Sequence, residues 1–197
     1  MCAGDLSRVR RLVREAYSAA ATTPAACHPF PVGREFAASL GYPAESLASL
    51  PAASVEAFSG VSTVSLLAEI QPGATVLDVG CGAGLDSLIA ARRVGPHGRV
   101  IGLDFSADML ARARAAVAEA GIPQVCFALA AAECLPLPDA SIDAAMVNGI
   151  FNLNPARTSI FNELARVLRP GGAVWVAELV LSQPLPPQPQ IMSDWFA

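Results

Sequence analysis

The first third of the chain carries apolar residues at helical spacing. Leu6, Val9 and Val13 fall on one face of a predicted helix over residues 5–21. Shorter helices are predicted over three further ranges, 34–40, 44–50 and 61–70. Together these segments predict a helical N-terminal cap over residues 1–72.

From residue 73 the pattern changes to short apolar runs that alternate with helical stretches. Strands are predicted over 75–79, 100–103, 125–129, 144–147 and 173–181. Helices are predicted between them, over 84–94, 106–120 and 155–168. Such alternation is typical of βαβ units, so we predict an α/β domain over residues 73–181: a parallel sheet with helices on both faces. A proline-rich, extended tail is predicted over 182–197.

The composition is that of a folded protein, and the overall charge lacks the basic excess that is typical of nucleic-acid-binding proteins. Hydrophobic residues make up 53% of the 197 positions, charged residues only 15%, and the net charge is −4. Every cationic residue is an arginine. Four of them crowd the first predicted helix: Arg8, Arg10, Arg11 and Arg14. They form either a solvated helix face or a surface for an anionic partner.

The cysteines and the longest apolar runs bear on compartment and metals. Five cysteines occur without a CxxC pair, which argues against a zinc site and against a disulfide framework. No apolar run approaches the roughly 20 residues that a membrane span needs. The charged N-terminus lacks the apolar core of a signal peptide. We therefore predict a cytoplasmic protein with no membrane partner and no metal.

The first predicted strand runs into a glycine-rich turn, which holds Gly80, Cys81, Gly82 and Gly84. Glycines permit a tight turn and a close approach of a ligand to the main chain. The spacing is G-x-G-x-G, whereas dinucleotide-binding folds usually show G-x-G-x-x-G, and residue 85 is leucine. A nicotinamide-dependent dehydrogenase is therefore the weaker interpretation of this turn.

Three aspartates mark the kind of ligand expected there. Asp78 precedes the loop and Asp86 follows it in the first turn of the next helix. Carboxylates on both sides disfavour a pyrophosphate and suit a ligand with an ammonium and a sulfonium group. Asp104 ends the second strand, about 20 residues after the loop, where an acid can accept both ribose hydroxyls.

With these motifs the sequence resembles the class I S-adenosylmethionine-dependent methyltransferases from residue 74 to 181, and the arsenite methyltransferases over nearly the whole chain. The segments that carry the resemblance are 75–86, 93–104, 105–110, 132–143, 148–153 and 167–172, with 40–43 and 58–60 in the leader. The resemblance implies a Rossmann-like fold, S-adenosylmethionine as the cofactor and a small-molecule methyl acceptor.

By the same resemblance, the glycine loop holds the methionine part of the cofactor, and the residues concerned are Gly80, Cys81, Gly82 and Gly84. Asp78 would lie near the ammonium group, and Asp104 would bind the ribose. Ordinary capping or turn roles are the alternative for both aspartates.

Other cofactor contacts are implied along the next strands. Phe105 and Met109 would flank the adenine, although helix-to-sheet packing is an equal alternative for both. Ala132 and Glu133 would meet the adenine edge, and Asn148 would line the methyl-transfer site.

The thiols expected for arsenite chemistry are largely missing. As(III) is thiophilic and requires soft thiolate ligands. Gly60 and Gly149 stand where the family has cysteines, and Phe58 stands where it commonly has a cofactor-contacting tyrosine. A further family cysteine lies beyond residues 195–197, where this sequence ends. Only Cys27 matches a family thiol position.

Two consequences follow for function. The resemblance predicts that two strands that complete a class I sheet are missing. The sequence is then either a truncated product or a short relative whose bare edge strand favours pairing with a second copy. A protein that binds the cofactor without turnover is the alternative to an enzyme. No catalytic residue is identified, and the polar candidates for the acceptor side are Tyr17, His28, Asn148 and Asn152.

Overall fold

The structure is a computed structural model that describes residues 3–180. At its centre lies a five-stranded sheet in the order β3-β2-β1-β4-β5, in which every pairing is parallel. The strands are β1 (Thr75–Val79), β2 (Arg99–Asp104), β3 (Val125–Leu129), β4 (Ile142–Asn148) and β5 (Leu168–Ala177). Their carboxyl ends therefore meet at one edge of the sheet.

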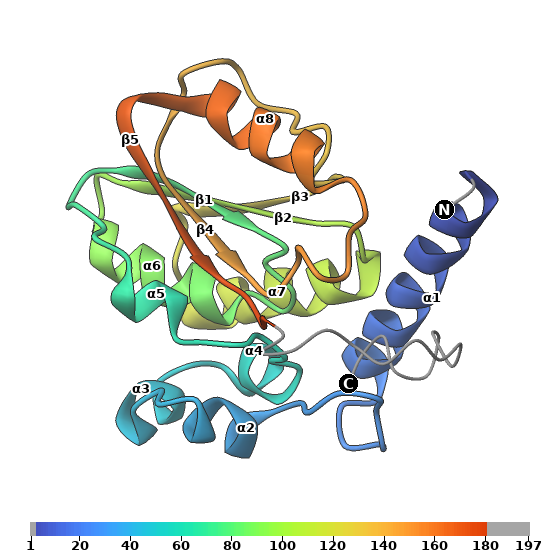
Figure 1. Cartoon of the computed structure of the whole chain (residues 1–197). Helices are drawn as coiled ribbons and strands as arrows, with labels where there is room; N and C mark the ends of the chain where they lie inside the picture. The colour runs from blue at the N-terminus through green and yellow to red at the C-terminus, as the bar shows by residue number, and fades with distance from the viewer. Residues whose placement is uncertain (1–2, 181–197) are drawn as a thin grey trace.

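Helices cover both faces of the sheet, which confirms the predicted α/β architecture (Figure 1). On one face lie α5 (Val64–Leu67), α6 (Leu85–Val94) and α7 (Ala107–Ala120); on the other lies α8 (Arg157–Val167). The predicted N-cap and C-terminal stop of α7 are confirmed. The Ser106 hydroxyl accepts the Met109 amide, and Gly121 adopts the left-handed conformation after the last turn.

The central strand shows why its sequence is an almost continuous apolar run. Val76 packs with Val94 of α6 on one face, and Leu77 packs with Leu164 of α8 on the other. Because neighbouring side chains point to opposite faces, a strand covered on both sides must be apolar at both parities. After the half-buried Thr75 at its start, Asp78 is the one polar residue of this strand, and it is almost fully buried.

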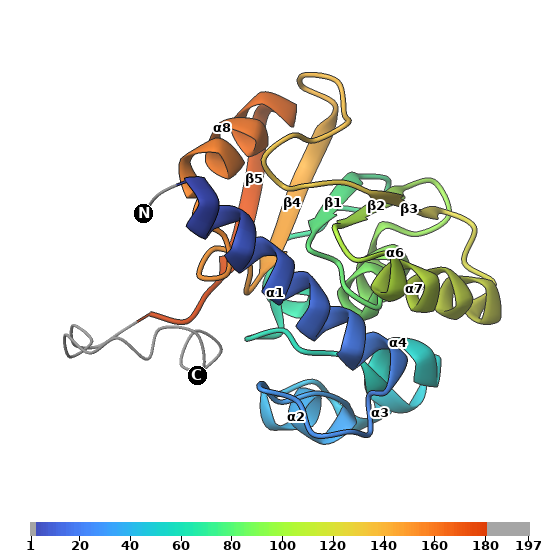
Figure 2. The same cartoon turned by 90° about the vertical axis from the view of Figure 1, so that its right-hand side faces the viewer.

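Besides α5, four helices of the described chain precede the sheet: α1 (Ala3–Thr22), α2 (Arg34–Ser39), α3 (Ala44–Ala48) and α4 (Ala52–Glu56). The short helices α2 to α4 pack on α6 and α7 through a shared apolar cluster. Helix α1 runs diagonally past the carboxyl edge of the sheet (Figure 2). There Ser18 Oγ lies 3.2 Å from Ser106 Oγ, and Arg112 Nη1 donates to the Ala21 carbonyl at 3.0 Å.

Some boundaries differ from those predicted. The helix expected over 61–70 is confined to α5. The Ser62 carbonyl, which would accept the Leu66 amide in a longer helix, accepts the Tyr42 hydroxyl and Asn148 Nδ2 instead, and the backbone turns extended at Ala68. Helix α4 was not predicted. Strand β5 begins earlier than expected, and the tail predicted over 182–197 lies outside the described residues. Within residues 3–180, no helix is long and apolar enough to cross a membrane.

Candidate functional site

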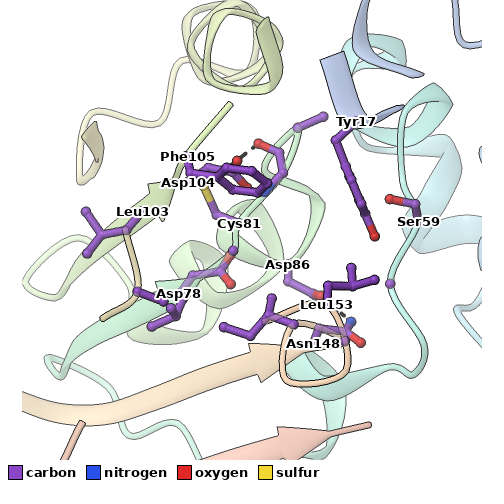
Figure 3. Close-up of a pocket in the computed structure, with 18 of the residues that line it drawn as sticks. Tyr17, Ser59, Asp78, Cys81, Asp86, Leu103, Asp104, Phe105, Asn148 and Leu153 are labelled. Atoms are coloured by element: carbon purple, nitrogen blue, oxygen red, sulfur yellow. Dashed lines mark hydrogen bonds between the residues drawn. The ribbon is translucent and has the colours of Figure 1, made fainter. Parts of the chain in front are cut away.

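A pocket opens at the carboxyl edge of the sheet, beside the central strand β1 (Figure 3). Its walls come from the ends of β1 to β4, from α1 and from the segment after α4. The chain runs from β1 to β2 on one side and reaches β4 on the other, so this is the switch point of the sheet. Open α/β sheets bind their ligands at such points.

All of the predicted cofactor residues except Gly84 and Met109 line this pocket: Phe58, Asp78, Gly80, Cys81, Gly82, Asp104, Phe105, Ala132, Glu133 and Asn148. Segments far apart in the sequence thus converge as the motifs implied. The carboxyl ends of parallel strands bring them together.

The glycine loop is held against β2. The amides of Gly80 and Cys81 both donate to the Leu103 carbonyl, at 2.7 and 3.0 Å. Gly80 and Gly82 have φ angles of 74° and 52°, in the left-handed region that favours glycine. A Cβ at Gly82 would meet only the Met109 sulfur, at 4.0 Å, so open space adjoins the main chain there. The loop therefore presents bare backbone to the pocket.

Gly84 and Met109 lie behind this loop. Gly84 begins α6 with a φ of 85°, and a Cβ there would lie 3.2 Å from both Ala113 and Phe127. Met109 is buried in an apolar cluster with Ala83 and does not reach the pocket. For Met109, helix-to-sheet packing is what the structure shows, and for Gly84 close approach of α7 is the reason for glycine.

Three buried carboxylates surround the loop. Asp78 accepts the Ser87 hydroxyl at 2.5 Å. Asp104 accepts the Gly82 amide at 2.9 Å through one oxygen and the Ser106 amide at 2.8 Å through the other. The Phe105 amide also lies close to this carboxylate. Since a carboxylate has about four lone-pair sites, Asp104 keeps at least one of them for a ligand.

Asp86 is instead committed to the protein. It accepts hydrogen bonds from the Tyr42 hydroxyl at 2.6 Å, from the Ser65 hydroxyl and from Asn148 Nδ2 at 2.9 Å. Asp86 thus joins α6 to the segment around Tyr42 and to the end of β4. The position of Asp86 after the glycine loop predicted that a carboxylate lies here, but it did not predict which residues bond to it.

Asn148 has its amide similarly occupied. Its Oδ1 accepts the amides of Val61 and Ser62 at 2.8 and 3.1 Å, and its Nδ2 donates to the Ser62 carbonyl at 2.8 Å and to Asp86. A side-chain amide offers two N–H donors and one carbonyl acceptor, and all of them are in use. Asn148 therefore lines the pocket while fastening the segment after Gly60 to β4.

Burial raises the pKa values of all three carboxyls, because a charged group loses its hydration there. The pKa of Asp78 rises to about 8, chiefly by burial and then by the negative charge of Asp86. The pocket thus holds acids whose ionisation needs a positive charge nearby. Among the described lining residues the only cation is Arg10, and it is paired with Glu133.

These raised pKa values predict how stability depends on pH. Since the folded state keeps protons on Asp78 that the unfolded chain releases near pH 4, the free energy of unfolding should fall as the pH rises from about 4 to 8. Thermal melting of the unliganded chain between pH 5.5 and 8 would measure the slope. Asp78→Asn should reduce this slope, and the raised pKa values of Asp86 and Asp104 account for what remains. Glu163, whose pKa is lowered to about 2 by Arg166, titrates below this window. An equal slope in the variant would assign the effect elsewhere.

The mouth of the pocket brings Glu133 together with Arg10 and with Asn154, which no sequence motif marked. Glu133 accepts hydrogen bonds from Arg10 of α1 and from Asn154 Nδ2, the latter at 2.8 Å. Arg10, Val13 and Tyr17 line the pocket at helical spacing, so one face of α1 closes it. The helical pattern could have marked this face as buried, but it carries no information on what the face covers.

Of the polar candidates for the acceptor side, Tyr17 and Asn148 line the pocket. The Tyr17 hydroxyl lies near that of Ser59 (Figure 3). His28 and Asn152 lie outside: His28 Nε2 is 2.9 Å from the Thr23 carbonyl, and Asn152 Nδ2 donates to Glu178 at 3.1 Å.

No lining thiolate replaces the missing family cysteines. Cys81 is the one cysteine among the described lining residues, and burial raises the pKa of its thiol well above the ordinary value. Cys27, Cys126 and Cys134 are exposed and unpaired. At Gly149, where φ is 79°, a Cβ would lie 3.0 Å from Val61.

Gly60 has no room for a side chain. A Cβ there would lie 2.5 Å from Asn148 Nδ2 and 2.8 Å from the Phe58 ring. Gly60→Ala should therefore lower the free energy of unfolding by about 1–3 kcal/mol through overpacking, as measured by denaturant titration. In a chain that already carries Asn148→Ala, part of this loss should disappear, because the obstructing amide is gone. Equal losses in both backgrounds would contradict the close approach.

Comparisons with known proteins agree with this geometry. Residues 70–197 match the methyltransferase domain family. The arsenite methyltransferase of Halobacterium salinarum is 39% identical over 155 residues, which cover 79% of this chain and 39% of that protein. A demethylmenaquinone methyltransferase of Listeria monocytogenes is 39% identical over 132 residues, which cover 66% of this chain and 54% of that protein.

Among solved structures, an arsenic(III) S-adenosylmethionine methyltransferase from Chlamydomonas reinhardtii superposes with a TM-score of 0.61 at 28% identity, covering 79% of this chain and 52% of that one. The chain thus spans between about two fifths and just over half of these relatives. The predicted Rossmann-like fold is confirmed, and the chain belongs to the methyltransferase domain family.

Proposed function

We propose that the pocket binds S-adenosylmethionine and that the protein transfers its methyl group to a small-molecule acceptor. Membership of the family and its solved neighbours imply this cofactor. The observation that carries the proposal is the trio of buried carboxylates around bare glycine backbone, with no free cation among the described lining residues. A ligand with an ammonium and a sulfonium group supplies the missing positive charge.

Different pocket residues would bind different parts of the cofactor. Gly80, Cys81 and Gly82 would hold the methionine part, and Asp78 would face its ammonium group. Asp104 would accept the ribose hydroxyls through its free lone pairs. The adenine would lie against residues from the ends of β2 and β3, namely Phe105, Ala132 and Glu133. Phe58 and Asn148 would complete the wall of the cofactor site. Gly84 and Met109 would support the glycine loop by packing behind it.

The chemistry follows from this arrangement. When bound, the cofactor supplies an electrophilic methyl group on sulfur. The protein aligns an acceptor with that group and excludes water, by means of α1 and the segment from Phe58 to Gly60. Methyl transfer rests mainly on proximity and alignment, so a dedicated base is not required. The pocket residues described above are accordingly binding and positioning groups.

Calorimetric titration with S-adenosylmethionine, and separately with S-adenosylhomocysteine, tests the proposal. We expect one site with micromolar affinity, and proton release above about pH 6 as Asp78 ionises beside the bound cation. Titration with NADH is the matched comparison for a dehydrogenase and should give no heat. Failure of both sulfur ligands to bind would contradict the proposal.

A protein that binds the cofactor without turnover is the second candidate. It is favoured by Gly60 and Gly149, which leave two expected thiol positions without a side chain. Methylation of any acceptor with release of S-adenosylhomocysteine excludes it. Binding of the cofactor without methylation of any acceptor in a broad screen would favour it.

The proposal includes a cytoplasmic homodimer that engages neither nucleic acid nor membrane. The free cysteines and the net acidic charge are in keeping with that compartment and with a small-molecule partner. Among residues 3–180, no strand pairs with the outer side of β5, and Val176, Leu179 and Val180 are exposed there. Pairing through this edge would cover them. Sedimentation equilibrium, with Val176→Lys as the edge variant, tests the dimer.

A further inference from the structure

One wall of the pocket lies opposite the glycine loop. It is built from α1, the segment after α4 and the loop after β4, and we call it the outer wall: Tyr17, Phe58, Ser59, Gly149, Ile150 and Leu153. Figure 3 shows Tyr17 and Ser59 across the pocket from Leu103, at the end of β2. If the cofactor lies on the glycine loop, the acceptor must lie against this wall.

The charged and amide groups next to the outer wall are already satisfied. Asn148 uses its whole amide on Val61, Ser62 and Asp86, and Asp86 receives three donors. To bind a ligand, one of these groups would first have to give up an existing hydrogen bond. Each such bond contributes about 0.5–1.5 kcal/mol to the stability of the fold. These groups therefore shape the wall but do not bind an acceptor.

The polar groups at the mouth are likewise engaged. Glu133 is shared between Arg10 and Asn154, and Asn154 Oδ1 accepts the Ala156 amide at 2.8 Å. Arg10 is thus no free partner for an anionic acceptor.

The hydroxyls of Tyr17 and Ser59 are different. They lie next to each other on the outer wall, and at most one of their two O–H groups is used between them. A hydroxyl has one donor and two acceptor positions, so the pair keeps an O–H and lone pairs for a ligand. Burial, followed by the negative charges of Asp104 and Glu178, raises the pKa of Tyr17, which keeps the phenol protonated as a donor.

The charge of the pocket and the absence of soft ligand atoms in it further limit the kinds of acceptor that can bind. An anion would meet the negative charges of Asp104 and Glu178, and no free cation of the described lining would offset them. An ammonium has no lone pair with which to attack a methyl group. Arsenite would find no thiolate, since Cys81 is held as the thiol. The rest of the outer wall is apolar side chain and glycine backbone.

We infer that the acceptor is an uncharged organic molecule with an apolar body, which presents a hydroxyl group to the Tyr17–Ser59 pair. This inference rests on the proposed methyltransferase function. In the reaction, the acceptor oxygen forms a bond to the methyl carbon, the sulfur–carbon bond breaks with its electron pair passing to sulfur, and the hydroxyl proton leaves to water at the mouth.

Binding to the chain saturated with S-adenosylhomocysteine tests the acceptor class without turnover. Two probes share one ring system: 2-naphthol, which is uncharged with a hydroxyl, and 2-naphthoate, which is anionic. We expect calorimetry to show 2-naphthol binding at least about tenfold more tightly than 2-naphthoate, a difference of about 1.4 kcal/mol. Arsenite with glutathione should give no heat of binding.

Variants test the hydroxyl pair. Tyr17→Phe and Ser59→Ala should each weaken 2-naphthol about fivefold, which corresponds to one lost hydrogen bond, and leave S-adenosylhomocysteine affinity within about twofold. Ser141→Ala removes a hydroxyl that bonds to the Pro138 carbonyl outside the pocket, and should change neither affinity.

The outcomes separate the two levels of inference. If S-adenosylhomocysteine binds but 2-naphthol does not, or if 2-naphthoate or arsenite binds as tightly as 2-naphthol, the acceptor class is overturned and the cofactor site stands. Unchanged 2-naphthol affinity in both hydroxyl variants would also overturn it. If S-adenosylhomocysteine itself fails to bind, the proposed function falls and the acceptor class falls with it.

Discussion

A chain carrying Gly82→Val is expected to lose S-adenosylmethionine binding by at least about a hundredfold, or about 2.7 kcal/mol, and to keep its fold. The valine side chain would enter the open space beside the glycine loop, where its nearest neighbour is the Met109 sulfur at 4.0 Å. The protein interior therefore tolerates it, whereas a ligand that lies on bare backbone does not. Calorimetry measures the affinity, and circular dichroism reports the fold.

The control for Gly82→Val must carry the same backbone strain. Gly82 has a φ of 52°, and a branched residue is disfavoured in that region. Gly73→Val imposes similar strain, because Gly73 has a φ of 81° in an exposed turn with nothing near its would-be Cβ. It should melt at a lower temperature yet bind the cofactor normally. Equal affinities in the two variants would show that the loop is not the cofactor site.

Asp104→Ala should weaken S-adenosylmethionine by about 5- to 150-fold, or about 1–3 kcal/mol. Two effects add. The ribose hydroxyls lose their acceptor, and the Gly82 and Ser106 amides lose the carboxylate that fixes the loop against β2. Adenosine should weaken to a similar degree as the whole cofactor, because both contain the ribose.

Two further variants interpret that result. Asp104→Asn keeps one oxygen for a backbone amide, so its affinity should lie between those of the parent and Asp104→Ala. Asp108→Ala removes an exposed acid from the first turn of α7 and should leave affinity unchanged. If Asp104→Ala binds adenosine as tightly as the parent, the ribose assignment fails.

The sequence predicted the sheet better than the cap. Strand β1 and helix α7 follow from local signals, namely an apolar run before a glycine turn, and an N-cap serine with a C-terminal glycine. The segment from Val61 to Ile70 looks helical by the same criteria. It forms only the short α5, because the Ser62 carbonyl is occupied by the Tyr42 hydroxyl and by Asn148, which lies far along the chain. A local pattern cannot report such a competitor.

The site shows the same division. Glycines and aspartates of the loop were found because their chemistry is unusual inside a buried strand–turn–helix. Gly84 and Met109 carry identical signals, yet packing accounts for both of them. Arg10 was marked only as one of four arginines on the first helix, because its pairing depends on Glu133, which lies far along the chain. The sequence thus predicted which types of residue lie at the site. The tertiary fold determines which of those side chains still have hydrogen-bonding groups free for a ligand.

Helix α1 also makes the exchange of ligands a question of rate. Its inner face carries Arg10, Val13 and Tyr17 over the pocket, so we expect ligands to leave faster when this helix lifts. Helix motions of this kind take microseconds to milliseconds. The Arg10 end is fastened to Glu133 by an ion pair whose arginine side chain is 50% exposed, and salt screens such pairs. Residence times in the pocket should therefore shorten as ionic strength rises, even where the equilibrium affinity stays the same.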